Sequence, residues 1–341
     1  MTQPWARIAI VNFNGAAWLQ KAVDALGRQT FEHFEAVIVD NASTDDSLTA
    51  LTLPDARFSV LRLSSNLGFA AANNLAFRDC QTPWLATLNP DAFPEPDWLD
   101  QLRSGIARHP DVAMFGSTQI DATDRGTLDG CGDCYSVFGF PWRGGQGQPV
   151  SAAPADDIEV FAPCAAAALY RRDAYEAVGG FDERFFCYLE DVDLGFRLRL
   201  FGHCCVQLRR ALVYHVGSAL SGRDSAFTLF QSYRNRVWLI VKDVPFPLVL
   251  LMLPYHVGLC LRDIVHLRGT RDDSAPLKGL IAGILGVPRQ LLARWRIQRA
   301  RRAGWRDIAS MLAWEKQMMV ERRVIALGAR SRAGVVRRAA G

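Results

Sequence analysis

Apolar runs of strand length alternate with segments of helical periodicity through the first 120 residues, and this alternation constrains the fold more than any other feature. The predicted strands are 6–12, 34–43, 58–66, 84–91 and 111–120, and the predicted helices between them are 16–30, 68–80 and 96–110. Strands and helices that alternate at this spacing form βαβ units, which require parallel strands. The sequence therefore predicts an α/β fold with a mostly parallel sheet flanked by helices.

Polar residues stand at the exits of four consecutive predicted strands. They are Asn12, Asp40 with Asn41, Asn66 and Asp91. Ligands of open α/β sheets bind outside the carboxyl ends of the strands, so these side chains predict a binding site there. Local turn chemistry is the alternative, because Asp40, Asn41 and Ser43 also suit a turn followed by a helix N-cap.

The net charge of +4 hides an uneven distribution along the chain. Residues 289–341 carry 13 arginines and one lysine against three acidic residues, which leaves the first 288 residues with a net charge of −7. A basic tail on an acidic body predicts an anionic partner for the tail, either phospholipid headgroups or nucleic acid. A tail that is merely soluble is the alternative.

The composition changes after residue 243. An apolar stretch of about 17 residues is followed by a shorter one, PLKGLIAGILGVP, and then by the arginine-rich segment LLARWRIQRARRAGW. A spanning helix needs about 20 apolar residues. Apolar pieces beside arginine and tryptophan favour a region that lies in the membrane interface, although a helical subdomain packed on the body is the alternative.

Two features bear on the cellular compartment. The N-terminal segment MTQPWARIAIVNFN has no long apolar run after a basic start, so we expect no secretory signal. The eight cysteines are irregularly spaced, which is typical of reduced thiols rather than of a disulfide framework. Both observations indicate a cytosolic protein.

Residues 121–158 are rich in glycine, aspartate and proline, and they predict an irregular loop region.

Five motifs occur in order along the chain: VNFNG, VDNASTD, NLGFAAANN, LNPD, and GGFDERFF followed by YLEDVDLGFRLR. Together they resemble the family 2 glycosyltransferases, and in particular the bacterial rhamnosyltransferase-like branch of cell-wall and surface-polysaccharide assembly. The resemblance runs from about residue 6 to 240. It implies a GT-A fold for residues 1–243, and the composition after residue 243 predicts a helical, basic, membrane-interfacial region over residues 244–341.

The resemblance implies a donor site for a nucleotide sugar. Asp40 ends a strand, where it can accept hydrogen bonds from a pyrimidine imide or a ribose hydroxyl, and Gly68 permits a close backbone approach to a ligand. Arg234 suits a diphosphate because its guanidinium binds two oxygens at once. The expected donor-binding residues are Asn12, Asn14, Asp40, Asn41, Asn66, Gly68, Asn73, Asn89 and Arg234. The Gln-x-x-Arg-Trp motif of processive synthases is not matched, because Asn235 follows Arg234.

Asn89-Pro90-Asp91 stands where family members often carry Asp-x-Asp, so the resemblance assigns a divalent metal ligand to Asp91. Mg²⁺ or Mn²⁺ usually binds through one or two carboxylates plus substrate phosphates, so one carboxylate suffices. Pro90 fixes φ and restricts the following residue. His215, after the run ALVYHV, is the second candidate for the metal or the diphosphate. A turn at Asp91 and a structural role for His215 are the alternatives.

Glu190 and Asp191 follow a run of aromatic residues in GGFDERFFCYLEDVDLG. A sugar hydroxyl needs a proton acceptor, and apolar neighbours raise the pKa of a carboxylate toward a useful value. The resemblance makes Asp191 the base and leaves Glu190 to orient the acceptor or the loop. Gly179 and Gly180 are expected to line the acceptor site. Acidic residues that complement a helix dipole are the alternative, which explains Asp193 at least as well.

Together with these residues, the resemblance implies an inverting, metal-dependent glycosyltransferase. The expected donor is dTDP-rhamnose, with UDP-hexoses as the alternative, and the expected acceptor is a polyprenyl-diphosphate-linked glycan. We expect a peripheral protein on the cytoplasmic face of the inner or plasma membrane, with no nucleic-acid partner. Two other classes stay open, a catalytically inactive nucleotide-sugar-binding protein and a nucleic-acid-binding protein that uses the arginine-rich tail.

Overall fold

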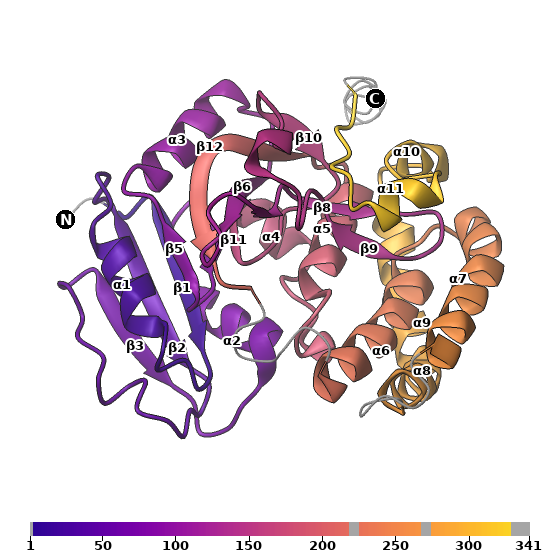
Figure 1. Cartoon of the computed structure of the whole chain (residues 1–341), viewed down its shortest axis with the longest axis horizontal. Helices are drawn as coiled ribbons and strands as arrows, with labels where there is room; N and C mark the ends of the chain where they lie inside the picture. The colour runs from indigo at the N-terminus through magenta and orange to yellow at the C-terminus, as the bar shows by residue number, and fades with distance from the viewer. Residues whose placement is uncertain (1–2, 218–224, 267–273, 329–341) are drawn as a thin grey trace.

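One mixed sheet of ten strands forms the centre of the computed structural model, which describes residues 3–217, 225–266 and 274–328 (Figure 1). The strand order is β10-β12-β6-β11-β4-β1-β2-β3, with β5 paired to β12 and β7 paired to β6. The bounds are β1 Ala6–Asn12, β2 Phe34–Asp40, β3 Phe58–Arg62, β4 Trp84–Leu88, β5 Ala92–Pro94, β6 Met114–Asp121, β7 Leu128–Gly130, β10 Ile158–Val160, β11 Ala167–Arg171 and β12 Cys205–His215.

Strands β3, β2, β1 and β4 run parallel, and β6 and β12 are also parallel to each other. Strand β11 is antiparallel and lies between β4 and β6. The mostly parallel α/β sheet predicted from the sequence is confirmed. Because the register pairs Asn12 with Asp40, the polar exits of β1 and β2 lie side by side.

Helices cover both faces of the sheet, and the alternation of side chains along β1 explains why. Ile8 and Ile10 pack with α1 Leu19–Gly27 and α3 Trp98–Arg108 in one buried cluster. Ala9 and Val11 point to the other face, where they pack with α2 Gly68–Phe77, α4 Arg172–Ala177 and α5 Glu190–Leu200. Successive side chains of a strand point to opposite faces, so a wholly apolar strand must be covered on both.

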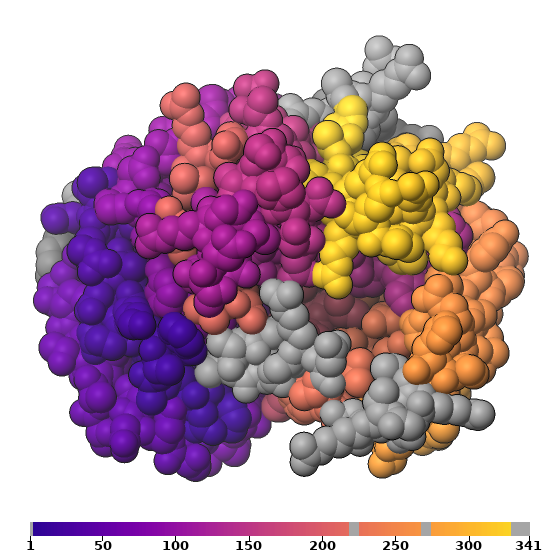
Figure 2. Space-filling model, in the orientation of Figure 1, coloured from indigo at the N-terminus to yellow at the C-terminus, as the bar shows by residue number. Residues whose placement is uncertain are grey.

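Residues 121–158 are not an irregular loop, contrary to the prediction. They contain β7 and a hairpin of β8 Asp133–Tyr135 and β9 Pro141–Arg143, with Tyr135 fully buried. The C-terminal segment lies against this hairpin, because the Gly145 amide donates to the Arg322 carbonyl at 2.6 Å and the Trp142 indole donates to the Arg323 carbonyl at 3.0 Å. Figure 2 shows the two segments in contact, in yellow and magenta.

The C-terminal region is helical and lies at the end of the molecule opposite β3 (Figure 1). Its helices are α6 Ala226–Lys242, α7 Phe246–His266, α8 Ala275–Leu285, α9 Val287–Ala300, α10 Trp305–Ser310 and α11 Lys316–Val320. Helix α7 has 21 residues with Pro254 inside it, and it extends beyond the apolar stretch predicted from the sequence. Among the described residues it is the one helix long and apolar enough to cross a bilayer, and 22% of its most apolar window is buried.

The boundary predicted after residue 243 remains a prediction. Later segments pack back on the α/β body, since the Ala303 amide donates to the Leu200 carbonyl at 3.0 Å and the Ala313 amide donates to the Tyr135 carbonyl at 2.9 Å. All eight cysteines are free thiols.

Helix α8 packs closely on α6 because glycines face the contact. A Cβ on Gly279 would lie 2.5 Å from the Phe230 carbonyl oxygen, and a Cβ on Gly283 would lie 2.9 Å from the Val237 Cβ. The opposite side of α8 is left open, with Ile281 49% exposed. The glycine spacing in GLIAG therefore determines how near α8 approaches the helix that borders the cavity described below.

We expect Gly279→Val to lower the free energy of unfolding by roughly 1–3 kcal/mol, because the added carbons must displace the backbone of α6. Gly258→Ala in α7 is the matched control, since a Cβ there meets no atom within 4 Å. The control should be neutral or stabilising by up to about 1 kcal/mol, because alanine favours a helix over glycine. Thermal and urea unfolding measure both variants, and equal stabilities would contradict the packing described.

Candidate active site

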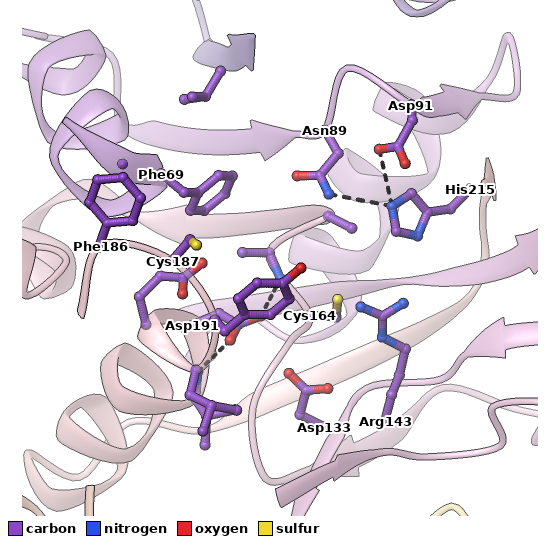
Figure 3. Close-up of a pocket in the computed structure, with 18 of the residues that line it drawn as sticks. Phe69, Asn89, Asp91, Asp133, Arg143, Cys164, Phe186, Cys187, Asp191 and His215 are labelled. Atoms are coloured by element: carbon purple, nitrogen blue, oxygen red, sulfur yellow. Dashed lines mark hydrogen bonds and ion pairs between the residues drawn. The ribbon is translucent and has the colours of Figure 1, made fainter. Parts of the chain in front are cut away.

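A cavity of about 750 Å³ opens where β1, β2 and β4 end (Figure 3). The lining residues come from chain segments that are far apart in sequence. Eight of the residues singled out from the sequence are among them: Asn41, Asn66, Gly68, Asn89, Asp91, Glu190, Asp191 and His215. The fold thus brings the expected metal residues and the expected base to one cavity.

Asp91 and His215 form the first polar group of the cavity. Strand β5 follows directly after Asp91 and pairs with the end of β12, which sets His215 opposite Ala92. The Asp91 Oδ1 lies 3.3 Å from the His215 Nε2, and the Asn89 Nδ2 lies 3.3 Å from the same nitrogen (Figure 3). Both Asp91 and His215 are buried, at 4% and 2% exposure. A carboxylate oxygen and an imidazole nitrogen are thus adjacent at the cavity wall.

Asp129 and Arg143 complete this group, and neither was found from the sequence. The His215 Nδ1 lies 2.7 Å from the Asp129 Oδ2, and Arg143 forms an ion pair with the same carboxylate. Asp129 belongs to β7 and Arg143 to β9, strands of three residues each. Such short strands carry no measurable periodicity, so only the charges themselves could have drawn attention to them.

The pKa values of this group follow from its contacts. Burial lowers the pKa of His215, but hydrogen bonds to Asp129 and Asp91 outweigh it and raise the pKa to about 8. Burial raises the pKa of Asp91, but the His215 contact outweighs it and the pKa lies below its ordinary value. The pKa of Asp129 is also low, because Arg143 and His215 outweigh the effect of burial. Both carboxylates are therefore ionised at neutral pH.

Asp191 and Glu190, at the start of α5, form the second polar group. The Asp191 Oδ2 accepts a hydrogen bond from the Ala165 amide at 3.1 Å, and its Oδ1 accepts one from the Val192 amide at 2.8 Å. Burial raises the pKa of Asp191, although these amides partly oppose the shift. The pKa of Glu190 lies well above its ordinary value through burial and then through the charge of Asp191. The Glu190 Oε2 has no hydrogen-bond partner among the described residues.

Two arrangements of side chains could hold a cation. Asp133, Cys164 and Asp191 bring ligand atoms within 4.8 Å of one another, and Asp91 with His215 forms the other. Burial raises the pKa of both Asp133 and Cys164, so these two groups favour their protonated forms. A metal needs deprotonated ligands, and Mg²⁺ and Mn²⁺ prefer oxygen, with imidazole also suited to transition metals. Asp91 is ionised and offers the oxygen that these ions prefer, whereas His215, with a pKa of about 8, would have to release its Nε2 proton as the ion binds. The ionised Asp91 carboxylate therefore makes Asp91 with His215 the better candidate pair.

Several expected donor residues do not line the cavity, and their side chains form hydrogen bonds to neighbouring groups of the protein. The Asn12 Nδ2 donates to the Asp40 Oδ1 at 3.3 Å and to the Ser47 Oγ at 2.9 Å, which ties the exits of β1 and β2 together. The Asn14 Oδ1 accepts from the Thr44 amide at 2.8 Å. Asn12, Asn14, Asp40 and Asn73 are all absent from the lining of the cavity.

Asn73 and Gly68 serve contacts within the fold. The Asn73 Nδ2 donates to the Phe69 carbonyl at 2.9 Å, one turn back in α2. Gly68 lines the cavity with φ of 83°, and a Cβ there would lie 2.5 Å from the Phe186 carbonyl oxygen. The close backbone approach expected at Gly68 is therefore made by the protein's own chain.

Arg234, Gly179 and Gly180 do not line the cavity either, so their expected contacts with donor and acceptor remain predictions. The Arg234 guanidinium donates to the Phe185 carbonyl at 2.9 Å and lies over the Trp238 ring at 4.5 Å, so it holds a loop. The glycine pair closes α4, with φ of 82° and 67°, a region where glycine is favoured. A Cβ on Gly180 would lie 2.8 Å from the Asn74 Oδ1.

Asp193 does not reach the cavity either. It is fully buried and pairs with Arg197 at 2.6 Å and with Lys242. These buried ion pairs give Asp193 a structural role, which differs from the helix-dipole role suggested for it from the sequence.

We expect Asp129→Asn to weaken Mn²⁺ binding roughly 10–100-fold, because a partner that orients a metal-ligating histidine contributes about that much to affinity. Isothermal titration with Mn²⁺ alone measures it. Asp124→Asn is the matched control, since Asp124 lies in the same segment but, among the described residues, its side chain bonds only within its own turn, accepting from the Thr127 hydroxyl at 2.6 Å. Unchanged Mn²⁺ affinity in Asp129→Asn would show that the histidine needs no such partner.

The family model for "Glycosyl transferase family 2" matches residues 7–179, and the match ends before Asp191 and His215. The N-acetylglucosaminyl-diphospho-decaprenol L-rhamnosyltransferase of Mycobacterium tuberculosis is 26% identical over 324 residues, covering 86% of this chain and 95% of the relative. The O-antigen biosynthesis protein RfbC of Myxococcus xanthus is 34% identical over 67% of this chain, which corresponds to 19% of that protein. This chain therefore spans about a fifth of the longer relative.

Two solved structures show the same fold at low sequence identity. The mannosyltransferase PcManGT from Pyrobaculum calidifontis, in complex with GDP-Man and Mn²⁺, has a TM-score of 0.53 at 16% identity, covering 88% of this chain and 86% of that one. The 1–349 fragment of TarS from S. aureus, in complex with UDP-GlcNAc, has a TM-score of 0.55 at 15% identity, covering 85% and 83%. With the family model matching half of its length, the chain belongs to glycosyl transferase family 2.

Proposed function

We propose that this chain is an inverting glycosyltransferase that moves a sugar from a nucleoside diphosphate to a hydroxyl group of an acceptor. The observation that carries the proposal is one cavity lined by both polar groups, Asp91 with His215 and Glu190 with Asp191. An inverting enzyme needs one site for the departing diphosphate and one base for the incoming hydroxyl. The cavity offers a candidate for each.

Asp191 is the proposed base. It removes the proton of the acceptor hydroxyl as the new bond from that oxygen to the anomeric carbon forms. The bond from the same carbon to the diphosphate breaks on the opposite side, so the configuration inverts. Hydrogen bonds from the amides of Ala165 and Val192 fix the carboxylate in place, and its raised pKa makes it a stronger proton acceptor than an ordinary aspartate. Glu190 is proposed to orient the acceptor or the loop.

Asp91 and His215 are the proposed ligands of Mg²⁺ or Mn²⁺. When bound, such an ion offsets the negative charge on the departing diphosphate. Asp129 keeps the Nδ1 side of His215 occupied, which leaves the Nε2 beside Asp91. The structures of PcManGT and of GalNAc-T7, a further neighbour with a TM-score of 0.56, were both solved with Mn²⁺, which supports a divalent ion here.

Asn41, Asn66 and Asn89 are the proposed donor contacts, because all three line the cavity near the exits of β2, β3 and β4. Asn12 and Asp40, which are buried, would act one layer behind by holding the two strand exits together. Asn14 is exposed and would hold the loop after β2 through the Thr44 amide. We propose dTDP-rhamnose as donor, since the M. tuberculosis relative is named an L-rhamnosyltransferase. A UDP-hexose is the second candidate, because TarS was solved with UDP-GlcNAc.

We propose a polyprenyl-diphosphate-linked glycan as acceptor and peripheral attachment to the cytoplasmic face of the inner or plasma membrane. The name of the same relative includes a diphospho-decaprenol. Exposed apolar side chains gather on α7, α8 and α9: Leu250 at 62%, Ile284 at 62%, Leu292 at 71% and Trp295 at 63%. Arg296 and Arg299 are exposed beside Trp295. Apolar side chains next to arginine suit anionic headgroups above an acyl boundary.

A donor and acceptor screen tests the proposal. The protein is incubated with Mn²⁺, with each nucleotide sugar in turn and with a synthetic polyprenyl-diphosphate-linked N-acetylglucosamine. We expect acceptor-dependent release of dTDP from dTDP-rhamnose and a product of inverted anomeric configuration by NMR. Donor binding without transfer to any acceptor would favour the catalytically inactive alternative, and a product of retained configuration would exclude the single displacement.

We expect Asp191→Asn to reduce the transfer rate by roughly 10²–10⁴-fold, because an amide cannot accept the proton. Titration calorimetry should find donor binding unchanged, since Asp191 is not assigned to the donor. In the wild type, burial raises the pKa of Asp191, so the rate should rise with pH through a value above about 4 and then level off as the carboxylate ionises. Normal transfer by this variant would contradict the assignment of the base.

We expect the paired change Leu292→Gln and Trp295→Gln to weaken binding to anionic phosphatidylglycerol vesicles at least 10-fold, because each buried apolar side chain contributes about 1.5–3 kcal/mol. Vesicle flotation measures the binding. Leu61→Gln on β3, at the opposite end of the molecule, is the control and should change nothing. Salt-sensitive binding to DNA together with no binding to vesicles would instead favour the nucleic-acid alternative.

A further inference from the structure

The loop that precedes the proposed base has an unusual backbone. Phe186, Tyr188 and Leu189 have φ of 65°, 67° and 66°, and none of them is a glycine. Residues with side chains rarely adopt this region, and they stay there only when surrounding contacts enforce it. All three residues line the cavity, and Glu190 and Asp191 follow directly. The position of Asp191 therefore depends on whatever holds this loop.

One side chain of α6 contacts three carbonyl groups of this loop. The Asn235 Nδ2 lies 3.0 Å from the Phe185 oxygen, 3.1 Å from the Cys187 oxygen and 2.7 Å from the Tyr188 oxygen. Asn235 is fully buried. The Arg234 Nε donates to the Asn235 Oδ1 at 3.0 Å, and an oxygen must occupy that position because arginine only donates. The orientation of the amide, with its NH₂ group toward the loop, follows from that contact.

Helix α2 contacts the loop at a further carbonyl. The Ala70 amide donates to the Phe186 oxygen at 3.1 Å, and Gly68 leaves room for that approach. Hydrogen bonds from the first turn of α2 and from the middle of α6 therefore both hold the loop in place. Asn235 itself is not among the cavity-lining residues, so it cannot act on a substrate directly.

We propose that Asn235 is a positioning residue for Asp191, which rests on the function proposed above. Its amide bonds to the carbonyl groups on both sides of Phe186 and thereby stabilises the left-handed backbone of the loop. That backbone determines where α5 begins, and so places Asp191 at the cavity. If Asn235 were only a structural residue, its hydrogen bonds would stabilise the fold without determining the position of Asp191. The difference is measurable, because a positioning residue changes the rate of the chemical step while leaving donor binding intact.

Asn235→Asp is the first test, because it keeps the shape and replaces two donors by a group that faces three carbonyl oxygens. We expect kcat to fall by about 100-fold, the loss typical when a catalytic group is displaced by about 1 Å. The KM and the Kd for the donor should stay within about threefold of the wild-type values, because Asn235 does not line the cavity in which the donor is proposed to bind. Asn235→Ala, which removes the amide altogether, should give the same split between kcat and KM.

Ile240→Ala is the matched control for a loss of packing. Ile240 is on the same helix and is 2% exposed, but it contacts Gly139 on the other side of α6. We expect it to lower the melting temperature while kcat stays near the wild-type value. If the Asn235 variants do not fold, Thr228→Val is the second test, because it removes the 3.0 Å hydrogen bond from the Thr228 hydroxyl to the Tyr188 hydroxyl on the same loop. It should lower kcat selectively by a few-fold.

Hydrogen exchange of the folded variants provides a readout independent of activity. We expect faster exchange in residues 185–193 of Asn235→Asp and unchanged exchange there in Ile240→Ala. A kcat within threefold of wild type in the Asn235 variants, or equal losses of kcat and donor affinity, would overturn the inference. The Asp191→Asn variant in the same assay separates the two proposals. If it is inactive while the Asn235 variants are active, only the positioning role fails, and if it is active, the proposed function itself fails.

Discussion

The two polar groups of the cavity are tied together by one short segment, Cys164–Ala166. The Ala166 carbonyl accepts a hydrogen bond from the Asn89 amide at 2.9 Å, and the Ala165 amide donates to the Asp191 carboxylate at 3.1 Å. This segment leads into β11, the antiparallel strand between β4 and β6. The insertion of that strand is therefore what brings the end of β4 and the start of α5 to the same cavity, although Leu88 and Glu190 are 102 residues apart in the chain.

The cavity has two halves that differ in electrostatics. Around His215, charged partners lower the pKa values of Asp91 and Asp129 despite burial, so these carboxylates stay ionised. Around α5, burial dominates and raises the pKa values of Glu190 and Asp191. Acidic residues whose pKa values are pushed apart by their surroundings commonly have different chemical roles. The same contrast motivates the assignment of a cation to the first half and of a base to the second.

The regular part of the fold could be predicted from the sequence, because long apolar runs carry a clear periodic signal. Strand β1 was predicted with its observed bounds, and the polar strand exits led to Asn41, Asn66 and Asp91 at the cavity. Asp191 could not have been chosen over Asp193 from spacing alone, since both lie at the start of one helix. The resemblance to a known family made that choice.

The rest of the candidate site depends on tertiary contacts, which no local sequence pattern encodes. Asp129 and Arg143 lie on three-residue strands, in a segment whose glycine and aspartate content suggested an irregular loop. Arg234 looked suited to a diphosphate because of its chemistry, but its position on α6 directs it to a backbone carbonyl. The role proposed for Asn235 likewise follows only from the packing of the loop before α5 against the same helix.

The division of the cavity into a cation half and a base half is tested most directly by locating the metal. Anomalous diffraction from crystals grown with Mn²⁺ and a non-hydrolysable nucleotide sugar would place the ion without reference to activity. We expect the anomalous peak beside the Asp91 carboxylate and the His215 Nε2. A peak enclosed by Asp133, Cys164 and Asp191 would contradict the account, because the carboxylate assigned as the base would then be a metal ligand.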